Sequence, residues 1–416
     1  MTFSKLAKYS VILSIIPALY VCFFPGKIVL VSILCAYPLL IGVLFEMGEL
    51  YKSKVQIHKN FEGAFYIKAF IFYNLIVFSR GLYDIKSEQD WVVMFSSTIP
   101  LFLVIHFSVY LAAYGAPIIA ICKAFLTYGL ILSLLIYLFL PPLSTDFAKS
   151  VSPIYLLIFM IPYINKKYQI FIIIIALISF LSDFSNRSNL INITIAFLIV
   201  ASFFWRKRKW ILSLIKSARV IFLFLPIFFL ILGVVGIFNI FLIGNLVSEY
   251  SLDLGNGNKQ DLLVDSRTSI YTDVFSQLEK DESLIFGLGA AGKTKTSLTD
   301  VSYADFDLIY KEGRRGTESG MLNYIQWGGL IGGLVYFLLF VKGSYLAIYK
   351  SKNWFCVMLG LWVAFKGLFS FIEDANYFGV SSIFIFSSIG ICFSKKIRYL
   401  DDAEVKLMFK KTLKWF

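Results

Sequence analysis

The chain has 416 residues, of which 58% are hydrophobic and 16% are charged, and its mean hydropathy is +0.77. Soluble domains are about half apolar and about a quarter charged, so this composition excludes an ordinary soluble protein and predicts an all-α, polytopic integral membrane protein. The net charge of +13 does not indicate a nucleic-acid partner, because the Lys and Arg residues lie in short loops where membrane topology accounts for them.

The cysteine and histidine content excludes several kinds of site. All five cysteines fall in apolar segments and none forms a Cys-x-x-Cys pair, so a disulfide framework is not expected. Only two histidines occur, His58 and His106, so neither a His-based zinc site nor a Ser-His-Asp triad is expected. We therefore expect no metal and no cofactor.

Twelve apolar segments are candidate membrane spans, which need about 20 residues each. They lie at residues 9–25, 28–45, 62–80, 91–111, 115–140, 151–164, 168–182, 189–205, 219–243, 321–341, 354–372 and 376–394. The sixth and seventh are short. Lys5 and Lys8 before the first segment imitate a secretory signal, but no small-residue cleavage site follows, so we interpret this segment as a retained span.

Basic residues determine the predicted orientation. Clusters of Lys and Arg follow spans two, six, eight, ten and twelve, and the strongest is Arg206–Lys209. Because positive residues accumulate on the cytoplasmic side, both termini are predicted there. The chain then divides into spans one to nine (1–243), a large external loop with short amphipathic helices (244–320), spans ten to twelve (321–394) and a basic cytoplasmic tail (395–416). The end of this tail is expected to lie on the membrane surface as an amphipathic helix.

The polar loop 244–320 is the one long interruption of the apolar pattern, so the specific chemistry is expected there. Asp265 or Ser266 can cap a helix that begins near Arg267, because Ile270, Val274, Phe275 and Leu278 follow at helical spacing. That helix is expected on the membrane surface or against the spans.

Glycines and a second cap mark the rest of the loop. The run Gly287–Gly292 predicts a turn, since it lacks the strand-turn-helix context of a phosphate loop. Thr317 is the expected cap of span ten, with Glu318 in its first turn. Gly328 and Gly329 inside that span predict close helix packing.

Four arginines on the predicted outer side are candidate ligands for phosphate, because a guanidinium group binds phosphate oxygens in a bidentate manner. Arg267 opens the amphipathic helix, and Arg187 lies in the polar turn 182–189 between spans seven and eight. Arg314 and Arg315 precede span ten. The alternative roles are solvated loop charges for Arg314 and Arg315 and an interfacial anchor for Arg187.

Three further residues are candidates for the site. Glu318 is either a favourable charge at a helix N-terminus, worth about 0.3–1 kcal/mol, or a general base that accepts a proton from a sugar hydroxyl. Lys366 lies inside span eleven, where a charge is costly and usually functional or paired; Glu373 and Asp374 are within reach. Tyr324 is one of several aromatic residues near the outer face that could stack on sugars or anchor the protein at the interface.

Together these elements resemble the bacterial O-antigen polymerase and O-antigen ligase superfamily of envelope glycosyltransferases. The resemblance rests on Arg187 in NRSNL, Arg267 in SRTSIYTDVF, the run GLGAAG about twenty residues later, and TESGMLNYIQWGGLIGG leading into span ten. Their order and the large external loop also match. The resemblance covers about residues 180–345.

The resemblance implies a metal-independent transferase of the inner (cytoplasmic) membrane with a periplasmic active face. Its donor and acceptor would be oligosaccharides on undecaprenyl pyrophosphate, bound from the membrane lipid. Arg187 and Arg267 would hold the pyrophosphate. By residue type and position, Glu318 is the candidate base for the acceptor, and the candidate substrate ligands are Arg314, Arg315, Lys366 and Tyr324. A chain-length regulator protein is a candidate partner.

The resemblance leaves more than one activity open. Ligases of the superfamily carry a His before the span that follows the large loop, whereas this chain has Glu318 there, which favours a polymerase of O-antigen or capsular polysaccharide. The alternatives are a ligase to lipid A core, a flippase for lipid-linked oligosaccharide, and a non-catalytic envelope protein. A flippase often has repeat symmetry and uniformly short loops, and neither is visible here.

Overall fold

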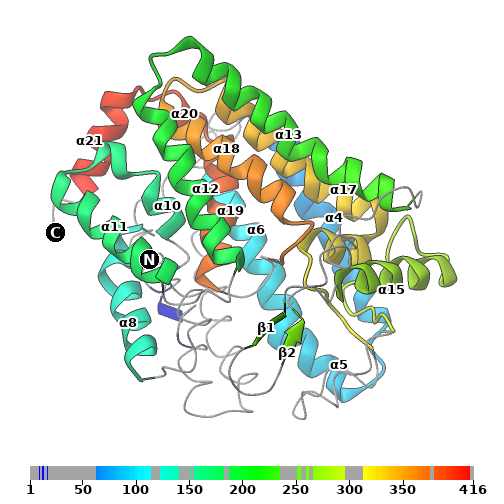
Figure 1. The fold of residues 1–416 in the computed structure, drawn as a ribbon. Coiled ribbons are helices and arrows are strands. Elements are labelled where there is room, and N and C mark those ends of the chain that lie inside the picture. Colours follow the sequence, from blue (N-terminus) through cyan, green and yellow to red (C-terminus); the bar gives the residue numbers. More distant parts are fainter. Residues whose placement is uncertain are drawn as a thin grey trace, which may run out of the picture.

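The computed structural model describes residues 9, 12–13, 16, 62–113, 122–139, 151, 154–181, 187–234, 251–253, 259–261, 266–295, 313–374 and 379–412. Within these residues the protein is nearly all helical (Figure 1), as the composition predicts. The two first predicted spans lie almost wholly outside the described residues. Two three-residue strands, β1 (Ser251–Asp253) and β2 (Lys259–Asp261), pair antiparallel in the polar loop.

Three of the described helices are long and apolar enough to cross a membrane. These are α4 (Ala64–Tyr83), α13 (Lys209–Val234) and α17 (Gly320–Tyr349). Shorter apolar helices accompany them. The protein is therefore a membrane protein by the length and composition of its helices, and the count of twelve spans stays a prediction.

The other helices follow the predicted segments in chain order. They are α5 (Glu88–Val93), the π-helix η1 (Met94–Thr98), α6 (Ile99–Ala113), the π-helix η2 (Phe125–Gly129), α8 (Leu130–Phe139), α10 (Ile154–Ile158), the 3-10 helix η4 (Ile161–Tyr163), α11 (Lys166–Leu181), α12 (Arg187–Phe204), α15 (Ser266–Lys280), α18 (Trp354–Phe369), α19 (Val380–Phe393), α20 (Lys395–Arg398) and α21 (Asp402–Thr412).

The structure describes only part of the predicted sixth span, residues 151 and 154–164. Its described residues form α10 and η4, with a turn between them. The five described α-helical residues rise about 7.5 Å, a part of the roughly 30 Å of a bilayer core, so the sixth span stays a prediction. Pro162 in the first turn of η4 lacks an amide hydrogen and suits a new helix start.

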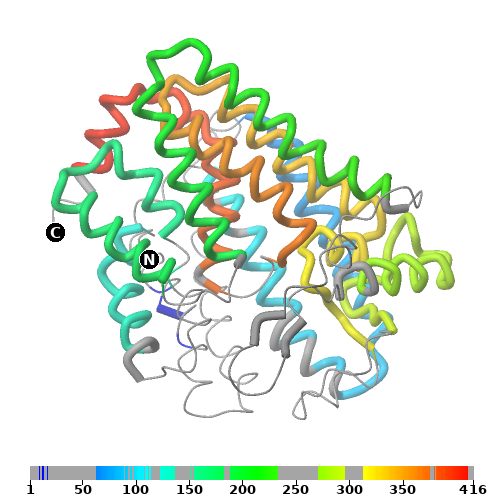
Figure 2. The backbone as a smooth tube through the Cα atoms, viewed as in Figure 1, coloured from blue at the N-terminus to red at the C-terminus, as the bar shows by residue number. Residues whose placement is uncertain are grey.

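Helix α18 lies at the centre of the bundle. Figure 2 shows it, in orange, beside α12, α13 and α17, and it also contacts α19. Nearly every residue of α18 is buried. Glycines permit the closest contacts: a Cβ added to Gly360 would lie 2.7 Å from the Cβ of Ala347 on α17.

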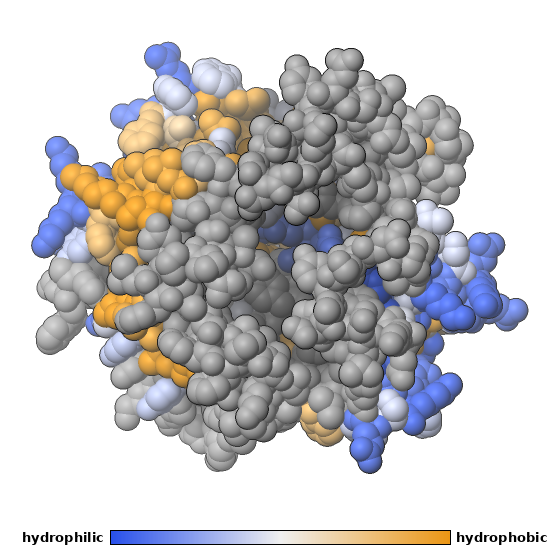
Figure 3. Space-filling view, turned by 60° about the horizontal axis from the view of Figure 1, so that its bottom comes forward, coloured by the Kyte–Doolittle hydropathy of each residue, from blue (hydrophilic) through white to orange (hydrophobic). Residues whose placement is uncertain are grey.

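Apolar side chains also cover much of the outer surface. Ile170, Phe171 and Ile174 on α11 and Phe224 and Phe228 on α13 are each 47–65% exposed. In Figure 3 apolar residues gather on the side where α8 and α11 lie, and hydrophilic residues gather on the opposite side, where α15 lies. Exposed apolar faces of this extent are expected of helices that contact lipid.

The helix of span ten is broken at Gly329, which has φ 65° and ψ −163°. Residues 283–292, here called the glycine loop, fill the break. Four backbone hydrogen bonds join the two: Leu288 N to Gln326 O at 2.8 Å, Gly289 N to Trp327 O at 2.9 Å, Leu330 N to Leu284 O at 2.9 Å and Ile331 N to Ile285 O at 3.3 Å. The predicted turn at the glycine run thus bonds to the backbone of α17. Close helix packing is confirmed at Gly328, where an added Cβ would lie 2.9 Å from the Tyr73 ring of α4, whereas the atoms nearest to a Cβ added at Gly329 belong to the glycine loop and not to another helix.

The end of the basic tail forms a helix, as predicted, but its apolar face packs on the protein. Val405 and Phe409 of α21 are buried, and the Phe409 ring contacts Phe355 at 5.2 Å and Tyr163 at 6.1 Å between centroids. The Asp402 carboxylate accepts hydrogen bonds from the Tyr163 hydroxyl and the Trp354 amide. The described part of this helix therefore does not present its apolar face to a membrane.

Candidate active site

Three helices begin close to one short segment, residues 370–374, which follows α18 and is called the α18 end below. The first turns of α17 and α12 donate hydrogen bonds to it, and α15 reaches it through a tyrosine in its second turn. Figure 1 shows α12 running beside α18 towards this end. The positive ends of three helix dipoles therefore lie around one segment on the predicted outer side.

Ser319 caps α17 and ties it to the α18 end. Its hydroxyl accepts from the Leu322 amide at 3.3 Å and donates to the Ser370 carbonyl at 3.1 Å. The Gly320 amide donates to the Glu373 carbonyl at 3.2 Å. The prediction of Thr317 as the cap is wrong, because the Thr317 hydroxyl instead bonds the Asn323 side chain and the Ser319 carbonyl.

Helix α15 begins where the sequence predicts, at Ser266, beside Arg267. Its predicted apolar face is confirmed, since Ile270, Val274 and Leu278 are buried. The Tyr271 hydroxyl donates to the Phe371 carbonyl at 2.8 Å and lies 3.1 Å from the Ser319 hydroxyl. Arg267 precedes Tyr271 by one helical turn, so the two positions share a face. The Arg267 side chain lies outside the described residues.

Arg187 is the first residue of α12, and its side chain also lies outside the description. Its neighbour Ser188 donates to the Glu373 carboxylate at 2.6 Å. One turn later, the Asn192 amide donates to the Ser188 carbonyl at 2.7 Å and accepts from the Lys366 ammonium at 3.0 Å. A buried polar chain thus holds the start of α12 against α18.

Lys366 therefore belongs to the packing of the bundle and not to an open surface. It is 7% exposed, and its ammonium lies 4.8 Å from the centre of the Phe369 ring, a cation–π contact, as well as on Asn192. The expected link to Glu373 exists through Asn192 and Ser188, not as a direct ion pair. These contacts favour a positioning role over the predicted contact with substrate.

Glu318 lies just before the helix, not in its first turn as predicted. Its side chain is 61% exposed, and its carboxylate is 3.8 Å from the Arg314 guanidinium. Because this carboxylate is largely exposed, a pair at this distance contributes little to stability, about 0–1 kcal/mol. The carboxylate is therefore accessible from outside, at the end of α17 that meets the α18 end.

Arg315 has a partner that the sequence analysis missed. Its guanidinium, 13% exposed, pairs with the carboxylate of Asp90, which also binds the Lys293 ammonium at 3.0 Å. Asp90 in turn closes a capping box with Ser87 at the start of α5. Burial lowers the pKa of the Arg315 guanidinium below its ordinary value. Arg315 thus joins the polar loop to α5, and the predicted substrate contact does not follow from this arrangement.

The capping box was visible as Ser87-x-x-Asp90, a pattern typical of a helix start. The pairing of Asp90 with Arg315, 225 positions later, was not visible.

Tyr324 is buried, with 2% of its surface exposed. Its ring stacks on Tyr336 at 4.0 Å between centroids and an interplanar angle of 15°. This ring lies in the core of the bundle, so it has no face available to a glycan in this structure. The predicted stacking of Tyr324 on sugars is therefore corrected to aromatic packing.

Comparison of the chain with protein-family models, with curated proteins and with solved structures finds no match. The described residues also contain no group of three or more His, Cys, Asp or Glu side chains arranged to hold a metal ion. The functional interpretation therefore depends on the chemistry of the α18 end and of the helix starts around it.

Proposed function

We propose that the protein is a surface-polysaccharide polymerase of the bacterial cytoplasmic membrane, with twelve spans and its polar loop on the periplasmic side. It transfers a growing glycan from undecaprenyl pyrophosphate to the next lipid-linked repeat unit. The observation that carries the proposal is the meeting of three helix starts at the α18 end. Each start holds, or lies beside, a residue suited to the reaction: Arg187, Arg267 and Glu318.

The meeting of the helix starts favours a doubly charged leaving group. A helix N-terminus carries the positive end of the helix dipole, which favours phosphate. The first amides of α17 already donate to the α18 end, so the starts of α12 and α15 are the ones proposed to face the phosphate. Arg187 and Arg267 stand in the first turns of α12 and α15, and guanidinium groups on both sides of a pyrophosphate neutralise it in a bidentate manner. Such donors accelerate transfer when charge develops on the departing oxygen.

Glu318 supplies the complementary half of the reaction. Its carboxylate accepts the proton of an acceptor sugar hydroxyl as the hydroxyl oxygen bonds to the anomeric carbon of the donor. The bond between that carbon and the pyrophosphate oxygen breaks, and the electron pair leaves with undecaprenyl pyrophosphate. The exposure of Glu318, 61%, supports access for a bulky glycan acceptor.

The buried chain from Lys366 to Glu373 positions this site. Lys366, Asn192 and Ser188 hold the start of α12, and the backbone of Glu373 receives the start of α17. A shift at any of these contacts would move Arg187 relative to Glu318. Misplacement by about 1 Å is enough to cost a large factor in rate.

The test is the length of surface polysaccharide in a strain that lacks the gene and carries a plasmid copy. Arg187→Ala, Arg267→Ala and Glu318→Gln should each leave a single repeat unit on the lipid in place of a ladder. Arg208→Ala and Glu279→Gln are matched controls, because both residues are exposed and distant in sequence from the helix starts. They should keep the full ladder.

The other outcomes of the same gel distinguish the alternatives. Polymer that accumulates on the carrier but never on lipid A indicates a ligase, and single units that accumulate inside the cell indicate a flippase. A full ladder in all three site variants, at wild-type protein levels, refutes the proposed polymerase site.

A further inference from the structure

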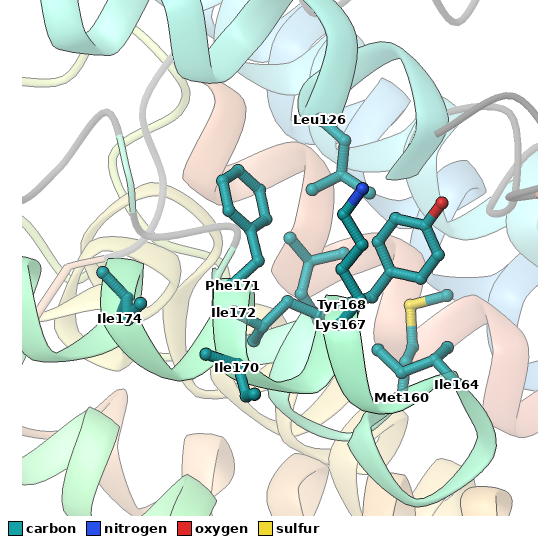
Figure 4. Close-up of a pocket in the computed structure, with 10 residues that line it drawn as sticks. Leu126, Met160, Ile164, Lys167, Tyr168, Ile170, Phe171, Ile172 and Ile174 are labelled. Atoms are coloured by element: carbon teal, nitrogen blue, oxygen red, sulfur yellow. The ribbon is translucent and has the colours of Figure 1, made fainter.

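A cleft of 380 Å³ opens beside α11, away from the α18 end. Figure 4 shows its lining. One wall is Leu126 of η2, and the other is formed by α10, α11 and the turn between them, with the lining residues Leu157, Met160, Ile164, Lys167, Tyr168, Ile170, Phe171, Ile172 and Ile174. Its volume lies within the range of ligand-binding cavities, about 300–1,000 Å³.

The lining suits a hydrocarbon chain. All ten lining side chains are apolar except Lys167 and Tyr168. From Lys167 to Ile174 the cleft follows α11 for about 10 Å, and Ile174 lies at the far end from Lys167 (Figure 4). Ile170, Phe171 and Ile174 are exposed, so the cleft is continuous with the apolar outer face of α11, where contact with lipid is expected.

The mouth of the cleft is positively charged. Lys166 and Lys167 are exposed and occupy the first turn of α11, which contains no acidic residue. Cations at a helix N-terminus oppose the helix dipole, so this pair contributes nothing to the stability of α11 itself. Among the described residues neither lysine forms an ion pair. The Tyr168 hydroxyl and the Lys167 ammonium extend in the same direction from α11 (Figure 4).

The turn that carries these lysines is held in place. The Gln169 side chain donates to the carbonyls of Ile161 and Ile164 at 2.9 and 3.1 Å. These bonds close the turn between η4 and α11 and hold in place Lys167, which lines the cleft, and its neighbour Lys166. The cationic mouth and the apolar interior are therefore parts of one preformed shape.

We propose that this cleft is a binding site for an anionic phospholipid. One acyl chain lies along α11, and the phosphate lies on Lys166 and Lys167 at the predicted cytoplasmic surface. Charge complementarity decides between lipids: a zwitterionic headgroup gains little from two adjacent ammonium groups, whereas each lysine near an anionic headgroup strengthens binding about fivefold. This site is independent of the proposed polymerase reaction.

The first experiment is native mass spectrometry of the full-length protein in detergent, with equal amounts of phosphatidylglycerol and phosphatidylcholine of identical acyl chains. The wild type should retain phosphatidylglycerol in preference. The variant Lys166→Ala/Lys167→Ala should lose about 25-fold in affinity for phosphatidylglycerol, two fivefold factors. The control Lys207→Ala/Lys209→Ala removes the same charge from two exposed lysines at the start of α13 and should retain the preference.

The second experiment blocks the apolar part. Ile174→Trp fills the far end of the cleft, and Ile178→Trp, one turn later and also exposed, is the matched control outside the lining. Both should fold, as judged by a single elution peak and an unchanged thermal midpoint. Retention of either lipid should fall only for Ile174→Trp.

The proposal is overturned if the two lipids bind equally to the wild type, if both lysine pairs act alike, or if Ile174→Trp retains lipid as the wild type does. The length of the surface polysaccharide distinguishes failure of this proposal from failure of the polymerase proposal. The cleft variants can lose bound lipid while the strain that carries them keeps its polysaccharide ladder.

Discussion

Gly329→Ala tests the break in α17 directly. Gly329 has φ 65° and ψ −163°, a region that only glycine adopts readily, at a cost of about 1–3 kcal/mol for other residues. An added Cβ would also lie 2.2 Å from the Ile285 carbonyl oxygen. The glycine loop must then retreat, which breaks its bonds to Leu330 and Ile331, worth about 1 kcal/mol each.

The backbone cost and the two lost hydrogen bonds together should lower the free energy of unfolding by about 3–5 kcal/mol. The measurement is an SDS titration of the purified protein in detergent. Limited proteolysis supplies a second measurement, because a displaced glycine loop should be cleaved between residues 283 and 292 while α17 stays protected. Gly343→Ala is the control in the same helix. Its φ is ordinary, its nearest contact is a side chain at 3.3 Å, and its stability should change by less than about 1 kcal/mol.

Equal stability and equal protection of the loop in Gly329→Ala and Gly343→Ala would refute this reasoning. The loop would then not depend on the broken helix, and its four backbone bonds would contribute nothing measurable.

The remaining predictions concern charged residues. Asp90→Ala leaves the guanidinium of Arg315 without its counter-ion and should lower the free energy of unfolding by about 2–4 kcal/mol. Asp90→Glu should recover part of this loss. An unchanged thermal midpoint in Asp90→Ala would contradict the pairing. Lys366→Met leaves the side-chain carbonyl of Asn192 without a donor, so the free energy of unfolding should fall by about 1–3 kcal/mol and the polysaccharide ladder should shorten. A fully stable variant with no ladder would instead indicate a direct contact of Lys366 with substrate. Burial raises the pKa of the Asp84 carboxyl, so its charged form costs stability at neutral pH. Asp84→Asn should raise the thermal midpoint at pH 7, and the gain should shrink as pH falls through the raised pKa, because the wild-type carboxyl then becomes neutral; a gain that is constant with pH would refute this.

The polar loop has a structural role as well as its proposed chemical one. Lys293 and Arg315 bind Asp90 on α5, Thr294 pairs with Arg314 as an antiparallel bridge, and the glycine loop completes the backbone of α17. Residues 283–295 and 313–315 of the loop are therefore fixed to α4, α5 and α17. Such fixation keeps the starts of α15 and α17 at a constant distance from the α18 end, as a preorganised site requires.

Properties that depend on local sequence were predictable from the chain alone. The all-α class follows from long apolar segments, since a backbone surrounded by lipid must bond within itself. The start of α15 and its buried face follow from a cap and a 3.6-residue period, with Ile270, Val274 and Leu278 on one side. These signals act between residues a few positions apart, so no tertiary contact is needed to interpret them.

Only the tertiary structure decided which groups are accessible and which are already paired. Arg315 and Lys366 carry the charges expected of ligands, yet Asp90 and Asn192 from distant segments bind them. Tyr324 faces Tyr336 and not the outside, and Gly329 breaks its helix because a loop about forty residues earlier supplies the missing hydrogen bonds. A polar or charged side chain in a low-dielectric interior is stable only when it has a hydrogen-bonding or charged partner. That partner can come from a distant segment, so the neighbouring sequence does not predict it.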